Sequence, residues 1–224
     1  MKKKVRKKFN FFKFLIFILS IYLLYIFTLY LFNIKTKNII ILNNEYYSDE
    51  LIIETAGLSN YPKFLTLSKS KIKKKLLKLD LIENVRVSKK YGSIVEINIS
   101  EKKILYFIRS NDLYKVSDDK NYLLDNINNV PVLINYVPED IEKRFVNAFK
   151  TVDSNIISLI SEIEYSKTSY DDERFLLYMN DGNEVYITVL KAKMLNKYID
   201  IVKKLDNKKG ILYLDSGNYF EIKK

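Results

Sequence analysis

The sequence contains neither cysteine nor histidine, and it holds only five glycines and three prolines in 224 residues. Without cysteine and histidine the protein cannot form disulfides, thiolate nucleophiles, imidazole bases or Cys/His zinc sites. The scarcity of glycine and proline leaves no room for a long flexible linker. Any catalysis would therefore have to use carboxylate, hydroxyl, lysine or tyrosine side chains.

Positive charge is concentrated at one end of the chain. The formal net charge is +11, but seven of the 38 basic residues lie in the first 13 positions, which contain no acidic residue. The remaining 31 basic residues are balanced by 27 acidic ones, which is ordinary for a protein surface. We therefore predict no nucleic-acid partner, because a short basic tail before an apolar run has a topological explanation instead.

The apolar run extends over 21 residues, from Phe14 to Ile34, without a charge, a glycine or a proline. At about 1.5 Å per residue, a helix of this length spans a hydrocarbon core of roughly 30 Å. The run is longer than the apolar region of a usual signal peptide, and no Ala-x-Ala-like cleavage site follows it. We predict a single transmembrane helix at 14–34, with the basic tail (1–13) in the cytoplasm and the rest of the chain outside. A retained signal peptide and a buried core helix are the alternatives.

Residues 37–103 form a first unit in which the pattern predicts the order β-α-α-β-β. The prediction comprises a strand at 38–43, a helix from Ser48 to Gly57, a helix at 68–79 and two strands flanking the turn at 91–93. The second helix carries the lysines Lys69, Lys71, Lys73, Lys74, Lys75 and Lys78. These lysines fit either a solvated helix face or a contact with anionic lipid headgroups.

Two stretches of this unit, "ILNNEYYSDELIIETAGL" and "KKKLLKLDLIENVRVSKKYGSIVEINISEKK", resemble the bacterial cell-division protein family FtsQ, called DivIB in Gram-positive bacteria. The resemblance implies that residues 37–103 are a POTRA domain. Asn43 stands where the family often has glycine, and Asp80 where it usually has proline. Neither departure disrupts the fold, since asparagine tolerates a turn conformation and aspartate can end a helix.

Residues 104–224 form a second unit that is rich in strands. We expect paired strands within 103–125, a short strand at 130–134, helix in two pieces over 139–161, a strand at 161–166 and a hairpin around the turn at 180–183. An amphipathic helix over 194–205 should pack on this sheet, and Asp215–Glu221 should form the last strand. The segments "PVL", "SEIEY", "NDGNEVYI" and "LDSGNYFE" resemble the C-terminal β-domain of the same family. The predicted fold class is thus α+β: an N-terminal transmembrane helix, a POTRA domain and a mixed β-domain with packed helices.

Acidic residues cluster at Asp171-Asp172-Glu173 and at Asp118-Asp119. Paired carboxylates can cleave glycosidic bonds, but both clusters lie in predicted turns, where solvated charge is the ordinary explanation. Ser-x-x-Lys occurs at Ser68–Lys71 and Ser100–Lys103, without the companion Ser-Asp-Asn and Lys-Thr-Gly motifs. No glycine-rich phosphate loop occurs. We therefore predict no enzymatic activity, no catalytic or metal-binding residues and no cofactor.

A sheet edge near the end of the chain suits strand pairing with another protein. The family resemblance implies the partners: the membrane-anchored coiled-coil proteins FtsB (DivIC) and FtsL, in a complex that helps to recruit and regulate the septal peptidoglycan synthase. The residues that match the family's partner-binding region are Asp215, Ser216, Gly217, Asn218, Tyr219 and Phe220. We expect Tyr219 and Phe220 to be anchors for the partner, unless one of them belongs to the core.

The sequence thus predicts a scaffold of the cell-division complex, inserted once in the cell membrane and located at the division septum. One alternative is a different anchored envelope protein that uses a POTRA unit. Another is a cell-wall hydrolase that depends on carboxylates. Substitution of Asp171 and Asp172 by asparagine distinguishes a hydrolase from a scaffold. A hydrolase would lose its activity, whereas a scaffold should still localise and bind.

Overall fold

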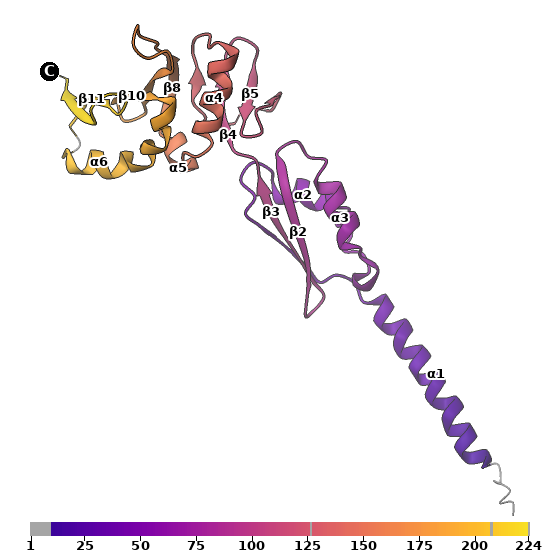
Figure 1. Ribbon diagram of the computed structural model, residues 1–224. Coiled ribbons are helices and arrows are strands. Elements are labelled where there is room, and N and C mark those ends of the chain that lie inside the picture. The colour runs from indigo at the N-terminus through magenta and orange to yellow at the C-terminus, as the bar shows by residue number, and fades with distance from the viewer. Residues whose placement is uncertain (1–9, 126, 207, 224) are drawn as a thin grey trace, which may run out of the picture. The chain divides into compact units, whose positions relative to one another are not determined.

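The first helix, α1 (Phe11–Asn33), carries no charge after Lys13 in its first turn, and none of its side chains is buried in the computed structural model (Figure 1). The structure describes residues 10–125, 127–206 and 208–223, so most of the predicted basic tail lies outside the described residues. The helix begins three residues earlier than predicted, because the Asn10 side chain caps it by accepting a hydrogen bond from the Lys13 backbone N–H at 3.3 Å. Among the described residues, α1 is the one helix long and apolar enough to cross a membrane.

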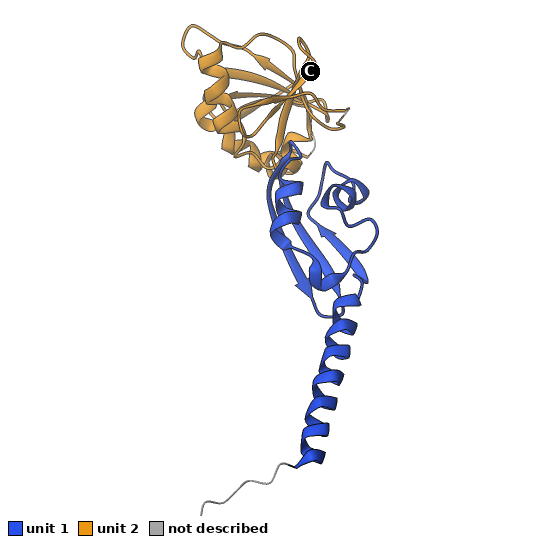
Figure 2. Cartoon of the chain, turned by 90° about the vertical axis from the view of Figure 1, so that its right-hand side faces the viewer, with its two compact units in different colours: residues 1–101 blue, residues 102–224 orange. Residues whose placement is uncertain are grey.

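The chain divides into two compact units, residues 1–101 and 102–224 (Figure 2). After α1 the first unit contains β1 (Asn38–Leu42), α2 (Asp49–Ala56), the 3-10 helix η1 (Phe64–Thr66), α3 (Lys69–Leu76), β2 (Ile82–Lys90) and β3 (Ile94–Glu101). The strand order is β1-β3-β2, with β1 parallel and β2 antiparallel to β3. The predicted β-α-α-β-β order is therefore confirmed.

Local signals explain the two helices of this sheet-and-helix domain. The Ser48 side chain caps α2, which ends at Gly57 in the left-handed conformation with φ 75°. Ser68 caps α3 in the same way. This helix ends at Leu76, three residues before the predicted end, and the chain then turns into β2. Ile72 and Leu76 of α3 are buried against Ile52 of α2 and the sheet.

The second unit is built on one large sheet. Its strands within the described residues are β4 (Ile104–Ile108), β5 (Leu113–Val116), β6 (Asn121–Tyr122), β7 (Val132–Leu133), β8 (Ile160–Tyr165), β9 (Arg174–Met179), β10 (Glu184–Thr188), β11 (Gly210–Tyr213) and β12 (Tyr219–Ile222). Their order across the sheet is β12-β11-β10-β9-β8-β7-β4-β5-β6. The turn predicted at 180–183 joins β9 to β10.

Helices pack on the sheet and form the core of the second unit. They are α4 (Glu139–Phe149), α5 (Ser154–Ile157), the 3-10 helix η2 (Val189–Lys197) and α6 (Tyr198–Lys204). Phe145 of α4 stacks on Phe149 at 4.8 Å and on Phe175 of β9 at 4.0 Å between ring centroids. The α+β class predicted from the sequence is confirmed.

Two helical predictions differ from the structure. The helix expected to reach Ser161 ends at Ile157, and β8 already begins at Ile160. The amphipathic helix expected over 194–205 is α-helical only from Tyr198, since η2 supplies its first part as a 3-10 helix. Its apolar side nevertheless packs on the core as expected, with Leu195 and Tyr198 buried.

Candidate functional site

The strands β11 and β12 form a hairpin at one edge of the large sheet. β12 pairs antiparallel with β11, in the register Gly210↔Ile222 to Tyr213↔Tyr219, and β11 pairs in parallel with β10. On its other side β12 has no strand partner within the described part of the chain. Such an edge leaves backbone N–H and C=O groups unpaired and able to accept another strand.

The register indicates which backbone groups face the open side of β12. The Lys223 N–H donates to the Lys209 carbonyl at 3.1 Å. In an antiparallel ladder, hydrogen-bonded pairs alternate with non-hydrogen-bonded pairs, so Tyr219 and Glu221 also direct their backbone groups toward β11. Phe220 and Ile222 therefore direct theirs outward.

The predicted last strand, Asp215–Glu221, is only partly correct. Asp215–Asn218 form the turn of the hairpin, and the strand runs from Tyr219 to Ile222. Asp215 starts the turn because its N–H donates to the Tyr186 carbonyl at 3.1 Å, while its side chain accepts from the Ser216 N–H at 2.8 Å. Asn218 takes the left-handed conformation with φ 53°, which asparagine tolerates better than most residues.

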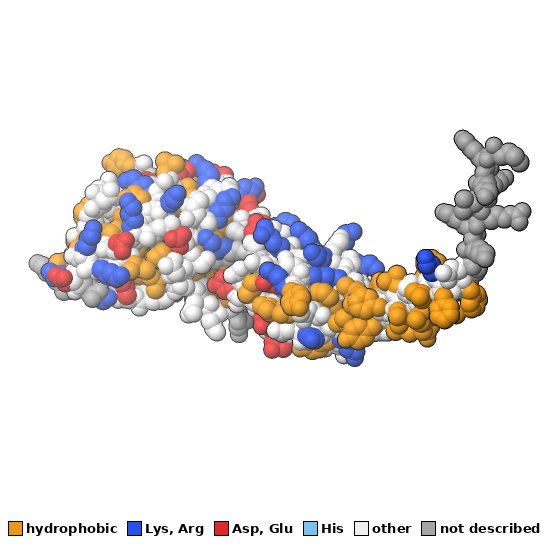
Figure 3. Space-filling view, turned by 90° about the horizontal axis from the view of Figure 1, so that it is seen from below, with side chains coloured by type: hydrophobic (Ala, Val, Ile, Leu, Met, Phe, Trp, Pro, Cys, Tyr) orange, Lys and Arg blue, Asp and Glu red, His pale blue; other side chains and the backbone are white. Residues whose placement is uncertain are grey.

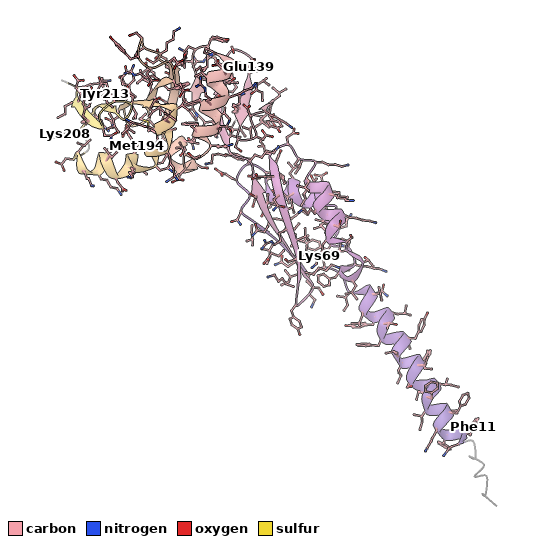
Figure 4. All side chains as sticks on the ribbon, in the orientation of Figure 1. Phe11, Lys69, Glu139, Met194, Lys208 and Tyr213 are labelled. Carbon is pink, nitrogen blue, oxygen red and sulfur yellow. The ribbon has the colours of Figure 1, made fainter. Side chains whose placement is uncertain are left out.

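Aromatic rings cross the last three strands on one face of the sheet. Tyr186 of β10 stacks on Tyr213 of β11 at 5.3 Å, and Tyr213 stacks on Tyr219 of β12 at 4.4 Å. The guanidinium of Arg174 lies 3.6 Å from the centre of the Tyr186 ring and pairs with the Asp215 carboxylate at 2.7 Å. We call Arg174, Tyr186, Tyr213 and Tyr219 the tyrosine ladder; Tyr213 is labelled in Figure 4. Each stacked pair stabilises the edge by about 0.5–1.5 kcal/mol beyond its buried area.

The two predicted anchors lie on opposite faces of β12. Tyr219 is half exposed at the end of the tyrosine ladder. Phe220 instead packs against the core of the second unit, and so the expectation that one of the two belongs to the core holds for Phe220. A hollow of about 340 Å³ opens beside the ladder and is lined by Thr168, Tyr170, Asp171, Arg174, Tyr213, Asp215, Ser216 and Tyr219. The hollow and the Tyr219 ring offer a binding surface next to the open edge.

Gly210 allows the two strands to approach each other. A Cβ atom at this position would lie 2.0 Å from the Glu221 carbonyl oxygen and 2.8 Å from the Phe220 ring, so only glycine fits. The Gly210 N–H donates to Oδ1 of Asn183 at 2.9 Å. Sequence reasoning missed this role, although an isolated glycine at the start of a strand indicates a close backbone approach.

Asn183 ties the hairpin to the turn between β9 and β10. It is almost fully buried, and its side-chain amide donates to Asp181 and to the Tyr198 hydroxyl, each at 3.0 Å. The Tyr198 hydroxyl in turn donates to the Asp181 carboxylate at 2.9 Å. Burial, together with this bond to Asp181, raises the pKa of Tyr198 and keeps its hydroxyl protonated. This hydrogen-bond network fixes the position of Gly210 at the start of β11.

Charged groups around the edge are paired. Lys223 binds Glu184 of β10 at 2.6 Å, and the Tyr213 hydroxyl donates to Glu221 at 3.2 Å. Partial burial and then the hydrogen bond to Glu221 raise the pKa of Tyr213. Lys224 lies outside the described residues.

The acidic clusters are held by other groups of the second unit. Glu173 pairs with Arg144, and Asp171 accepts hydrogen bonds from the Glu173 N–H at 2.9 Å and from Thr188 at 3.4 Å. Asp118 binds Lys102 at 2.9 Å and Tyr122 at 2.7 Å. Burial opposes ionisation of Asp118, but the bonds from Tyr122 and Lys102 hold its pKa below the usual value. In the parts of the chain that the structure describes, no group of three or more carboxylates could hold a metal ion.

Comparison with known proteins shows what the first unit and the chain as a whole are similar to. The POTRA domain of the FtsQ type matches residues 34–102. The cell division protein DivIB of Brevibacillus brevis is 28% identical over 195 residues, which covers 83% of this chain and 74% of that protein. DivIB of Bacillus subtilis is 28% identical over 194 residues (84% of this chain, 74% of that protein) and DivIB of Listeria monocytogenes 29% over 195 residues (84% and 72%).

A solved structure is also similar, that of the major extracytoplasmic domain of the cell division protein DivIB from Geobacillus stearothermophilus. It is 22% identical, with a TM-score of 0.38, and the match covers 48% of this chain and 97% of that domain. The similarity to cell-division proteins rests instead on the sequence comparisons. With a match to the FtsQ-type POTRA domain and similarity to several DivIB proteins over more than four fifths of its length, the chain is similar to the FtsQ/DivIB family of bacterial cell-division proteins.

Proposed function

We propose that this protein is a non-enzymatic scaffold of the bacterial cell-division complex, inserted once in the cell membrane and acting at the septum. Its similarity to this family supports a role in cell division. The length and apolar surface of α1 support a membrane anchor, whose preceding basic residues favour a cytoplasmic N-terminus. The bulk of the chain, from the segment after α1 to the end of the second unit, then lies outside the cytoplasm.

The scaffold binds its partner through the open edge of β12. The observation that carries this proposal is the unpaired side of β12 next to the half-exposed Tyr219 ring and the adjoining hollow. A partner strand pairs with the outward backbone groups of Phe220 and Ile222, while one of its side chains enters the hollow. The partners that the family suggests are the membrane-anchored FtsB (DivIC) and FtsL proteins, which connect the scaffold to the septal peptidoglycan synthase.

The absence of enzymatic activity is part of the same proposal. The acidic clusters, which are the strongest catalytic candidates, are engaged with Arg144, Lys102 and neighbouring backbone groups. Carboxylates engaged in this way stabilise turns. A chain with both Asp171→Asn and Asp172→Asn should therefore still bind its partner, because asparagine retains an acceptor oxygen at each position. Loss of a cell-wall hydrolysing activity in this variant would contradict the proposal.

The decisive experiment uses a proline at the outward position of β12. The full-length protein in lipid nanodiscs is titrated with the extracytoplasmic part of the cognate FtsB/DivIC–FtsL pair. Ile222→Pro removes the N–H that the partner strand would use, but it leaves the inward bonds to β11 in place. Ile222→Ala is the matched control, because it removes the side chain and keeps the N–H.

We expect Ile222→Pro to weaken binding by more than about tenfold, a loss of about 1.4 kcal/mol, and Ile222→Ala to weaken it much less. Equal effects of the two variants would mean that the Ile222 side chain, and not the strand edge, makes the contact. If the unchanged protein does not bind the pair at all, this partner assignment is wrong.

A further inference from the structure

The segment that follows α1, residues 34–37, is hydrogen-bonded to two turns of the first unit. Ile34 accepts from the Phe64 N–H at 2.9 Å, Thr36 donates its N–H to the Pro62 carbonyl at 3.0 Å, and Lys37 donates to the Ser93 carbonyl at 2.9 Å. Lys35 and Lys63 form an antiparallel bridge between these segments. A four-residue segment can reach at most about 14 Å, and these bonds shorten that reach further.

The two turns at this end are also tied to each other. The ammonium of Lys89, on β2, lies 5.2 Å from the centre of the Phe64 ring and donates to the Leu65 carbonyl at 3.3 Å. Partial burial, and then the charge of Lys69, lower the pKa of Lys89. The loop around η1 and the turn between β2 and β3 are therefore placed together beside the last turn of α1 by side-chain and backbone bonds.

The surface that results combines exposed aromatic and apolar side chains with cations. Tyr91 is fully exposed at the tip of the β2–β3 turn, and Tyr61 and Leu65 are each 45% exposed on the loop around η1. Lys35, Lys37 and Lys63 are exposed beside them. Within the described residues these three lysines make no ion pair with a carboxylate. We call Lys35, Lys37, Tyr61, Lys63, Leu65 and Tyr91 the anchor-proximal face.

We propose that the anchor-proximal face docks on the membrane that α1 crosses and binds the anionic headgroups of its phospholipids. Tyrosine is enriched at membrane–water interfaces, where its ring sits at headgroup level. Unpaired lysines near such a surface each contribute about a fivefold preference for anionic lipid. The apolar surface of α1 runs directly into this part of the unit, and Lys and Arg side chains gather next to it (Figure 3).

The lysines of α3 are a separate set that provides an internal comparison. Lys69, labelled in Figure 4, begins the helix close to η1, whereas Lys71, Lys74 and Lys78 lie further along it or beyond its end. These three side chains are exposed, as those of the anchor-proximal face are. They are not joined to the 34–37 segment by any hydrogen bond that the described residues form. Removing three positive charges from one set or the other therefore shows whether lipid binding depends on the anchor-proximal face or on the overall positive charge of the unit.

The test uses the full-length chain, which contains no tryptophan, in nanodiscs of neutral phosphatidylcholine or with about one third phosphatidylglycerol. A single reporter is introduced as Tyr91→Trp, and its fluorescence is quenched by a nitroxide carried on the lipid headgroup. Tyr170→Trp is the control, because Tyr170 is as exposed as Tyr91 but lies in the second unit. We expect strong quenching at Tyr91→Trp that increases with phosphatidylglycerol, and little quenching at Tyr170→Trp.

Charge removal then completes the test. In the Tyr91→Trp background, Lys35→Gln with Lys37→Gln and Lys63→Gln should lower the docked-to-undocked ratio by roughly fivefold per lysine. The control combination Lys71→Gln, Lys74→Gln and Lys78→Gln should leave this ratio unchanged. Quenching that is equal at both reporters, or equally sensitive to both triple variants, overturns the proposal.

The inference rests on the proposed membrane anchor, and the same experiment separates the two. A chain that does not enter nanodiscs refutes the anchor and the docked face together. A chain that enters them but leaves Tyr91→Trp unquenched refutes the docked face alone.

Discussion

The two units expose tyrosines in contrasting settings. In the first unit, Tyr61 and Tyr91 stand singly on turns, with unpaired lysines around them and the end of α1 next to them. In the second, Tyr213 and Tyr219 stand side by side on neighbouring strands, with Asp215 and Glu221 close by. Single rings among cations suit a fluid headgroup layer, whereas stacked rings beside an unpaired strand suit a partner of fixed shape. The contrast indicates that exposure alone does not define a binding surface; the neighbours of the exposed ring do.

The strongest way to break this contrast is to separate β12 from β11. Gly210→Ala places a methyl group 2.0 Å from the Glu221 carbonyl oxygen, which forces the edge strand away. We expect a loss of roughly 1–3 kcal/mol of stability in the second unit, measured by chemical denaturation, together with loss of partner binding. Gly217→Ala is the control, because its methyl group would only meet the exposed Tyr219 ring at 3.2 Å. If Gly210→Ala binds the partner normally, the hairpin is not the docking edge.

Removal of the buried Asn183 side chain should have the next largest effect on stability. Asn183→Ala leaves the Gly210 N–H and the Tyr198 hydroxyl without their buried partner. We expect it to destabilise the protein by about 1–3 kcal/mol in urea denaturation. Asn180→Ala, at the exposed start of the same turn, is the comparison and loses one bond to the Ser158 carbonyl. Equal destabilisation by the two substitutions would argue against a special role for Asn183.

Substitutions of the two aromatic residues of β12 distinguish an effect on folding from an effect on partner binding. Tyr219→Ala with Phe220→Ala should weaken partner binding without unfolding the first unit, as followed by titration and by circular dichroism. The single variants then divide the effect: Phe220→Ala mainly lowers stability because its ring packs on the core, and Tyr219→Ala mainly lowers affinity. Tyr219→Ala also removes the stacking on Tyr213, which should lower the free energy of unfolding by about 0.5–1.5 kcal/mol. A Tyr219→Ala protein that binds as tightly as the unchanged one would show that this ring does not touch the partner.

On the other side of the comparison, Lys89 holds the two turns of the anchor-proximal face together. Lys89→Met keeps the aliphatic stem but removes the cation that lies over Phe64. We expect a loss of about 0.5–1 kcal/mol in the first unit, which is typical of an exposed cation–π contact. Lys90→Met serves as a control, since that lysine forms an exposed ion pair with Glu96. A larger effect of Lys90→Met would assign the stabilising role to the ion pair.

The smallest expected effect is at alkaline pH. Tyr178 lies on the same face of the sheet as the ladder, and its hydroxyl donates to Glu164 at 2.7 Å. This bond raises the pKa of Tyr178 to about 12. Because the folded-state pKa is raised, its small stabilising effect is fully present below the unfolded value of about 10 and disappears as the pH rises through about 12. Tyrosinate absorbance of Tyr178→Phe against the unchanged protein checks this, and a difference that titrates near pH 10 would contradict it.

Local signals in the sequence were sufficient for much of the fold. Ser48 and Gly57 mark the two ends of α2, and the turn at 180–183 marks the β9–β10 hairpin, because each needs only a few neighbouring residues. The start of β12 was misplaced at Asp215. The strand instead begins at Tyr219, because Asp-Ser-Gly-Asn is a turn sequence.

Features that depend on distant contacts could not be read from the sequence. The position of β11 beside β10 requires a crossover through η2 and α6, and the buried Asn183 is recognisable only once Gly210 lies against it. The same is true of the anchor-proximal face, which joins segments 34–37, 61–65 and 91–93. The sequence left the lysines of α3 open between a solvated face and a lipid contact, whereas the face that we propose uses Lys35, Lys37 and Lys63.

The terminal hairpin is attached to the rest of the sheet over a short length. β10 and β11 pair only from Glu184↔Ile211 to Tyr186↔Tyr213. Short pairing at a sheet edge allows local opening well below the free energy of global unfolding, and backbone amides there exchange with solvent early. A partner strand that adds to β12 should therefore slow amide exchange throughout the hairpin, including at β11, which it does not touch. If a partner strand adds to β12 as we propose, it stabilises the whole hairpin. The protection factors of the hairpin amides would then report the fraction of the protein that is bound.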